Sequence, residues 1–281
     1  MQILSCVFLM VSLFRFPAEC FAAALEALRI WGLSVVPSLF PYMVLCRTLA
    51  AQFAQSRVSP MLAASVLGLL GGSPSGAAVL TRYPLNKRSL FSLCALTGTI
   101  SPMFLLNTAN LWAQDSLFCK RLLASHIVGA CMAAGALHYP LRHSCECAEH
   151  RISSSHDAHP IAQSISSILN VGGCIVFFSV AAKAITQNLP HAQAAASAVI
   201  HSLLEISGGL HSLLALSFHR TPFGASLCAA LCAFSGLSIL TQNHLMLKSC
   251  GVSMPYLILA ALLRALFSAA AMYLLCAFNL S

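Results

Sequence analysis

Apolar runs about as long as a bilayer is thick repeat along almost the whole chain, separated by short polar connections. A helix of about 20 apolar residues crosses the hydrocarbon core of a membrane. A short apolar run, 1–14, comes first, and 21–30 alternates apolar and charged positions as an interfacial helix does. The longer apolar stretches are 32–53, 60–80, 90–111, 122–139, 161–185, 194–218, 223–247 and 256–278. The pattern predicts an all-α fold, a polytopic membrane helical bundle of about eight or nine spans.

A long polar stretch, 141–160, separates two groups of apolar runs. Because its charges are concentrated and its apolar pattern lapses, we expect it to lie outside the membrane. The predicted organisation is a first span and interfacial helix in 1–29, a first half with a connector span in 30–139, a polar loop in 140–160, and a second half with a final span in 161–281.

The composition supports a membrane protein and not a water-soluble domain. Of the 281 residues, 58% are hydrophobic and 8% charged, and the mean hydropathy is +0.83. Soluble domains carry about 25% charged residues. The net charge of +8 is scattered over short loops, as at Arg82, Lys87 and Arg88, so it predicts loop anchoring at the lipid surface and no nucleic-acid groove. We expect a multi-pass protein of the cell membrane whose partner is the lipid bilayer. Orientation and oligomeric state stay open.

The cysteines and histidines do not form a recognisable metal-binding pattern. Most of the 13 cysteines lie inside apolar runs, where a thiol acts as a small hydrophobic group. The polar stretch contains Cys145, Cys147, His150, His156 and His159, but Cys-x-Cys alone is not a closed zinc spacing. We therefore expect a soluble polar loop, no metal and no cofactor.

Two halves of the chain resemble each other. The segment 93–98, Leu-Cys-Ala-Leu-Thr-Gly, recurs as Leu-Cys-Ala-Phe-Ser-Gly at 231–236, which is 138 positions later (231 − 93). Gly71 and Gly72 recur as Gly208 and Gly209, 137 positions later (208 − 71). Phe40 and Phe177 have the same spacing of 137 (177 − 40). These matches predict two repeated halves.

Glycine and proline interrupt the apolar runs at similar places in the two halves. Repeated halves with broken helices are typical of secondary transporters, in which unwound backbone faces a central binding site. We expect the pairs Gly71–Gly72 and Gly208–Gly209 to lie at corresponding non-helical or kinked positions. The alternative is that the glycines allow close helix packing and the prolines only kink their helices.

Four interrupted segments carry a resemblance to a known family. The segment 37–42, Pro-Ser-Leu-Phe-Pro-Tyr, and the segment 72–77, Gly-Ser-Pro-Ser-Gly-Ala, resemble motifs of the YlbJ-like sporulation integral membrane proteins. The segments 97–102 and 236–239, the latter followed by Gln242, resemble that family's polar Pro segment and its late Gly-Leu-Ser motif. These landmarks run in family order along nearly the whole chain.

The resemblance implies a nucleoside-recognition (Gate) domain, a transporter-like fold and a role in spore formation. A small polar solute such as a nucleoside would then be the ligand. The chain departs from the family pattern at Ala78, where the family has lysine, and at Gly98, where asparagine is common. A protein that kept the fold but lost transport, and serves in spore assembly, is the alternative.

Glu205 is the acid that falls deep in a predicted span. A carboxylate at this depth costs about 2.5–3.5 kcal/mol on insertion scales, so it faces a cavity, a partner or a proton path. Lys183 and Arg264 are candidate ion-pair partners, and His201 and His211 are candidate proton carriers. The other candidates for lining a solute or ion site are Pro37, Ser38, Pro41, Gly72, Ser73, Pro74, Ser75, Gly76, Thr97, Thr99, Ser101, Pro102, Asn107, Asn170, Ser207, Gly208, Gly209, Ser235, Gly236, Ser238, Gln242 and Asn243.

The sequence favours a protein that is not an enzyme. It contains no Gly-x-x-x-x-Gly-Lys nucleotide loop and no His-Glu-x-x-His, which argues against an ATP-driven pump and a metalloprotease. No aspartate falls within a predicted span, so an intramembrane aspartyl protease is also unsupported.

Overall fold

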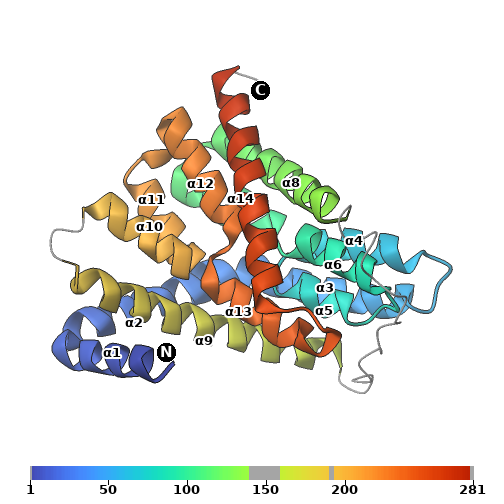
Figure 1. The fold of residues 1–281 in the computed structure, drawn as a ribbon, viewed down its shortest axis with the longest axis horizontal. Helices are drawn as coiled ribbons and strands as arrows, with labels where there is room; N and C mark the ends of the chain where they lie inside the picture. The colour runs from blue at the N-terminus through green and yellow to red at the C-terminus, as the bar shows by residue number, and fades with distance from the viewer. Residues whose placement is uncertain (1, 139–158, 190–192, 279–281) are drawn as a thin grey trace.

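The structure is a computed structural model that describes residues 2–138, 159–189 and 193–278. In this described part every regular element is a helix, which confirms the all-α prediction (Figure 1). Most of the predicted polar loop lies outside the described residues, including Cys145, Cys147, His150 and His156, and only His159 and Pro160 fall within them.

The helices before the polar stretch are α1 (Gln2–Arg15), α2 (Pro17–Ile30), η1 (Trp31–Val35), α3 (Val36–Phe53), α4 (Pro60–Gly71), α5 (Ser75–Leu80), α6 (Lys87–Thr97), η2 (Phe104–Ala109), α7 (Asn110–Ala113) and α8 (Ser116–His138). The helices after it are α9 (Pro160–Gln187), α10 (Ala194–Leu204), α11 (Ile206–Ala215), η4 (Phe218–Arg220), α12 (Pro222–Phe234), α13 (Gly236–Leu247), η5 (Lys248–Cys250) and α14 (Met254–Ala277).

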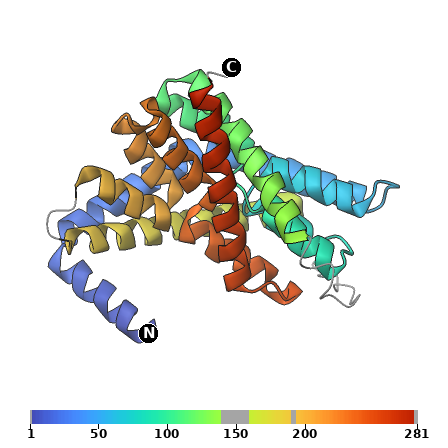
Figure 2. The same cartoon turned by 45° about the horizontal axis from the view of Figure 1, so that its top comes forward.

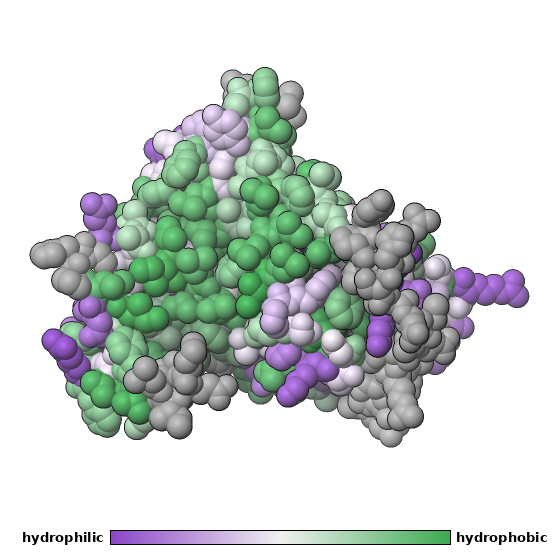
Figure 3. Space-filling view, viewed as in Figure 1, coloured by the Kyte–Doolittle hydropathy of each residue, from purple (hydrophilic) through white to green (hydrophobic). Residues whose placement is uncertain are grey.

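Five helical stretches in the described part are long and apolar enough to cross a membrane. They are Pro17–Phe53, Ser116–His138, Pro160–Gln187, Pro222–Cys250 and Met254–Ala277. In Figure 3 the middle of the visible face is hydrophobic, and the hydrophilic side chains gather towards its margins. Both observations support a membrane protein, and the count of eight or nine spans stays a prediction.

The first helix is shorter than the predicted first span requires. Its 14 residues measure about 21 Å at 1.5 Å per residue, whereas the hydrocarbon core is about 30 Å thick. Figure 2 shows α1 extending away from the rest of the bundle at the N-terminal end. As described, α1 is too short to cross the membrane on its own.

The helix α2–η1–α3 runs through the predicted boundary at residue 29 and through both prolines. The five residues of η1 form a π turn, in which the Val36 N–H bonds to the Trp31 carbonyl five residues back. Pro37 occupies the first turn of α3, and Pro41 lies inside the helix. The predicted interruptions at Pro37 and Pro41 are therefore wrong. Proline is tolerated in the first turn of a helix, where Pro37 lies, and the π turn before it shifts the hydrogen-bond register.

Two pairs of short helices fold back on themselves as hairpins. Helices α4 and α5 are joined by three residues, 72–74, and Gly72 there has a φ of +61°. Helices α10 and α11 are joined at Glu205, whose backbone is extended. A Cβ on Gly76 would meet the Gly68 carbonyl, and a Cβ on Gly209 would meet the backbone of Ser202. The close approach of residues on opposite sides of each turn identifies two tight helical hairpins.

The prediction for the paired glycines is right for Gly72 and wrong for Gly208 and Gly209. Gly72 lies directly after α4, at the turn. Gly208 and Gly209 are helical, in the first turn of α11, and the break falls earlier, at Glu205. They serve close packing instead, since Gly208 faces the ring of His201 and Gly209 faces Ser202. Close helix packing was the alternative interpretation of these glycines.

Two further helices are interrupted where the sequence predicted it. Helix α6 ends at Thr97, and the chain resumes a helical course after Ser101. Helix α12 ends at Phe234, and α13 begins at Gly236 and continues away from it in Figure 1. Ser235 and Gly236 both have positive φ values, +72° and +75°.

Helix α14 crosses the middle of the molecule and packs on α8 and α12 (Figure 1). Contact with α8 is close at Gly129, where an added Cβ would lie 2.8 Å from Cβ of Ser268 and 2.9 Å from the Arg264 carbonyl oxygen. On the same helix, Gly135 has nothing within 4 Å of such a Cβ.

These two glycines give a matched test of the α8–α14 contact. We expect Gly129→Ala to destabilise the protein by about 1–3 kcal/mol, because the methyl group overpacks the contact. Gly135→Ala should stabilise it by up to about 1 kcal/mol through helix propensity. Thermal unfolding in detergent measures both changes. Equal effects of the two substitutions would contradict the packing described.

Candidate functional site

A small cavity lies where the helix interruptions meet near the centre of the bundle. Its volume is about 40 Å³, which is room for ordered water or an ion and not for a larger solute. Apolar side chains of η1, α3 and α9 form part of its wall, among them Val35, Leu39 and Val171. The predicted site residues that line it are Ser73, Pro74, Ser101, Glu205, Ser207, Ser238 and Gln242.

Glu205 reaches this cavity from the turn of the second hairpin and is 1% exposed. Its Oε1 accepts the N–H of Ser207 at 2.8 Å, and its Oε2 accepts the N–H of Gly208 at 2.7 Å. These are unpaired donors at the N-terminus of α11, where the helix dipole also favours negative charge. The carboxylate is therefore held by backbone groups.

The two cations considered as partners of Glu205 lie elsewhere. Arg264 donates its hydrogen bonds to carbonyl groups of α6 and α12, and Lys183 lines a separate, larger cavity. Within the described residues the acid in the cavity is held without a basic side chain.

The tip of the first hairpin is tied to α13 by the side-chain amide of Asn243, and the neighbouring amide of Gln242 bonds within α13. Asn243 Nδ2 donates to Ser73 Oγ at 2.9 Å, and Gln242 Nε2 donates to Ser238 Oγ at 3.3 Å. The amide oxygens of Gln242 and Asn243 find no partner within the described protein, and neither do the buried hydroxyls of Ser75 and Thr99. Of these atoms, the Gln242 amide oxygen belongs to a residue that lines the cavity. Since buried polar atoms are normally bonded, it favours a ligand that donates a hydrogen bond or carries positive charge.

The polar side chains at the interruptions of α6 and α12 serve the backbone. Thr97 Oγ1 donates to the Leu93 carbonyl at 2.9 Å, and Ser235 Oγ donates to the Cys232 carbonyl at 3.1 Å. Ser235 Oγ also lies 3.5 Å from the Gly98 carbonyl oxygen of the other half. These hydroxyls stabilise the breaks and do not line the cavity.

Other predicted site residues are also placed away from the cavity. Asn107, Asn170 and Pro41 are exposed, and the Ser38 hydroxyl donates to the Ser34 carbonyl at 2.7 Å. The sequence could not reveal this, because the side of a helix that faces outward depends on how its neighbours pack. Pro37, Gly76, Pro102, Gly208, Gly209 and Gly236 belong to helix ends and close contacts and do not line the cavity.

Two residues that were not among the predicted site residues, Arg264 and His126, hold the interrupted helices in place. Arg264 is 2% exposed; its Nε donates to the Ala233 carbonyl and its Nη1 to the Ala95 carbonyl, both at 3.2 Å. His126 of α8 accepts the N–H of Ile100 on Nε2 at 3.1 Å. His126 precedes Arg264 by 138 positions (264 − 126), so the repeat spacing was a signal that could have identified it.

A larger and more open cavity of about 800 Å³ lies beside the second hairpin. Glu26, Lys183, His201 and His211 line it, and His201 Nε2 lies 3.2 Å from Ser179 Oγ. Glu205 and Ser207 of the hairpin line the central cavity, whereas its His201 and His211 line this larger one, so the hairpin lies between the two cavities. Across the described residues, no group of three or more His, Cys, Asp or Glu side chains is placed to hold a metal ion.

The role of Arg264 can be tested by removing its hydrogen bonds. Arg264→Leu removes its donors from two buried carbonyl groups and leaves the Ala233 carbonyl only a long contact, at 3.5 Å, with the Ser235 hydroxyl. A buried carbonyl that loses its partner costs about 1–3 kcal/mol, so we expect a lower unfolding temperature and a smaller folded yield. Arg264→Lys should lose less, because its ammonium still donates. Arg220→Leu, at an exposed position, is the control. Size-exclusion profiles and thermal unfolding report the result; an Arg264→Leu protein as stable as the control would refute the role.

Comparison with known proteins adds no relative: no family model, no curated protein and no solved structure matches this chain.

Proposed function

We propose that the chain is a transporter-like, Gate-domain membrane protein that moves a small polar solute, such as a nucleoside, by alternating access. The observation that carries this proposal is the central cavity, where both hairpin turns and an interrupted helix bring Glu205 together with the unpaired amide oxygen of Gln242. Binding at the membrane midplane between broken helices is the arrangement that secondary transporters use. The Gln242 amide oxygen is available to a solute there.

We further propose that the two halves are inverted repeats. The same order of elements occurs twice: a long helix, a hairpin, an interrupted helix and a long helix. In the first half these are α3, α4–α5, α6 to α7 and α8, and in the second they are α9, α10–α11, α12–α13 and α14. A hairpin returns to the side it came from, so the first half makes three crossings. The second half then starts from the opposite side.

This arrangement accounts for the eight or nine apolar segments of the sequence. Six segments would cross the membrane, the two hairpins would enter it from opposite sides, and α1 would add a ninth, partial segment. The two hairpin turns would then meet at mid-depth, where the central cavity lies.

Transport of a nucleoside requires the cavity to open. Sites for small organic ligands measure about 300–1,000 Å³, far more than the 40 Å³ present here. The α10–α11 hairpin lies between this cavity and the 800 Å³ cavity lined by Lys183 and His201. Displacement of the hairpin would join the two, which makes it the candidate gate.

The alternative is a structural or assembly protein of spore formation that does not transport. The small volume of the cavity favours it, as do Ala78 and Gly98, which stand where the similar family has lysine and asparagine. A sporulation role itself rests on the sequence resemblance.

The proposal predicts that solute uptake depends on the charge of Glu205. Purified protein in liposomes should take up a radiolabelled nucleoside from a test panel, and Glu205→Gln should reduce uptake at least about tenfold, a barrier change of about 1.4 kcal/mol. Gln still provides one acceptor for the α11 N–H groups, so folding should survive. Glu19→Gln removes an equal charge at an exposed position and should leave uptake unchanged.

Two outcomes would count against transport through this site. Full uptake in the Glu205→Gln protein would remove Glu205 from the mechanism. A well-folded wild-type protein that takes up none of the panel, together with a spore defect on gene deletion, would favour the structural alternative.

The inverted arrangement predicts the sides on which loops emerge. We expect cysteines introduced at Ser56 and Ser249 to react with a membrane-impermeant thiol reagent from one side and a cysteine at Arg220 from the other, in a background without reactive native cysteines. All three positions are exposed. Labelling of all three from one side would rule out this topology while leaving the Glu205 experiment unaffected.

A further inference from the structure

A second polar cavity, separate from the central one, lies at one end of the bundle. Its volume is about 510 Å³, and it is formed by the last turns of α3, the residues after α5, the first turns of α9, and η5. Arg47, Thr81, Arg82, Gln163, Ser167 and Ser249 supply its polar lining.

Two arginines in this cavity converge on one neutral side chain. Arg47 Nη1 lies 3.4 Å from Gln163 Oε1, and Arg82 Nη2 donates to the same oxygen. Arg47 Nη2 also donates to Ser167 Oγ at 2.6 Å. A single amide oxygen cannot balance two guanidinium charges, so the described residues give the cavity a positive potential.

Arg47 is buried far more deeply than a surface arginine. It is 5% exposed, and its Nε has no hydrogen-bond partner within the described protein. Burying a guanidinium that has no acidic partner among the described residues is costly, and an anion that accepts from Nε would offset this cost. Arg82 is half-buried at the mouth of the same cavity.

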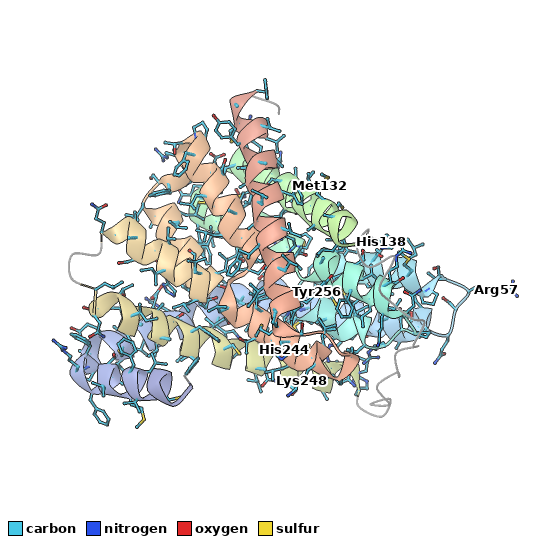
Figure 4. The ribbon with its side chains drawn as sticks, in the orientation of Figure 1. Arg57, Met132, His138, His244, Lys248 and Tyr256 are labelled. Atoms are coloured by element: carbon cyan, nitrogen blue, oxygen red, sulfur yellow. The ribbon has the colours of Figure 1, made fainter. Side chains whose placement is uncertain are left out.

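The surroundings of the cavity are basic and, in the described chain, free of acid. Arg57 projects from the tip between α3 and α4, and Lys248 lies at the lower end of the bundle, next to Ser249 (Figure 4). The described acids are Glu19, Glu26, Asp115 and Glu205, and none of them lines this cavity. The N-terminus of α9, a helix of 28 residues, adds its positive dipole end.

We propose that Arg47 and Arg82 form a binding site for a phosphate group. The planar guanidinium fork matches the oxygens of phosphate and binds them in bidentate fashion. The volume admits a group larger than inorganic phosphate. The phosphate belongs either to the headgroup of an anionic lipid, which this end of the bundle would meet at the membrane surface, or to a solute in water.

The solute source is tested with the full-length protein in an uncharged detergent. Sodium phosphate should raise the unfolding temperature more than sodium chloride of equal ionic strength, because a ligand that binds the folded state stabilises it. Arg82→Gln should weaken the apparent phosphate affinity at least tenfold. Arg57→Gln, an equal charge change at an exposed position that does not line the cavity, should leave the affinity unchanged.

The lipid source is tested in nanodiscs of phosphatidylcholine with or without phosphatidylglycerol. Native mass spectrometry should find phosphatidylglycerol retained on the wild-type and Arg57→Gln proteins and lost from Arg82→Gln. Arg47→Gln should behave as Arg82→Gln does. If it fails to fold, Arg47→Lys, which keeps the charge but not the fork, should bind with intermediate affinity.

Binding of phosphate or of phosphatidylglycerol that Arg82→Gln weakens and Arg57→Gln does not supports the site. The probe that binds shows whether the phosphate comes from a solute or from a lipid. The proposal is overturned if neither probe binds, or if Arg57→Gln weakens binding as much as Arg82→Gln, which would indicate diffuse surface charge. It is also overturned if phosphate binds only after Glu146, Glu149 and Asp157 are changed to their amides, because a carboxylate of the chain itself would then occupy the cavity.

Discussion

The fold depends on how two helices can end in the buried centre of the helix bundle, where no water reaches their last carbonyl groups. At the interruptions of α6 and α12, the carbonyl groups of the last turn lose their helical partners, and in hydrocarbon each would remain unpaired at high cost. Arg264 donates hydrogen bonds to both helix ends from one side chain: its Nε donates to the Ala233 carbonyl of α12, and its Nη1 donates to the Ala95 carbonyl of α6. Its positive charge also lies at the negative ends of two helix dipoles. One buried guanidinium therefore allows two interruptions to coexist.

The partner of this interaction is on the neighbouring helix. His126 of α8 accepts the free N–H of Ile100, which follows the interruption of α6. Because Nε2 is the acceptor, the ring carries its proton on Nδ1 and is the neutral tautomer. The Ala95 carbonyl before the break thus accepts a hydrogen bond from a cation, Arg264, and the Ile100 N–H after the break donates to a neutral imidazole, His126. The close contact at Gly129 brings α8 and α14 near enough for both to act at the same level.

The sequence predicted the class of fold well and the geometry of its site only in part. The matching segments 93–98 and 231–236 located the interruptions at Gly98 and Ser235, because a repeated motif marks a repeated local structure. Glu205 was identified because an acid is rare at that depth, and the structure places it on the cavity wall.

The failures have a common physical cause. Whether proline breaks a helix depends on compensation by its surroundings, and the π turn before Pro37 was not visible in the pattern. Whether glycine marks a break or a close contact depends on the opposing residue, as Gly209 against Ser202 illustrates. Asn107 and Asn170 were misplaced because helix rotation is decided by tertiary packing.

The π turn of η1 has a consequence for how the long first helix is put together. One extra residue in a turn rotates everything beyond it by about 100° relative to a regular α-helix. Trp31 can therefore face α9, where its Nε1 donates to the Ile168 carbonyl at 3.1 Å, while Val35 and Leu39 face the central cavity. The helical segments before and after the turn therefore point their side chains in directions that a regular α-helix could not combine. Loss of a single residue between 31 and 35 would restore the regular helix and turn one of these faces away from its neighbour.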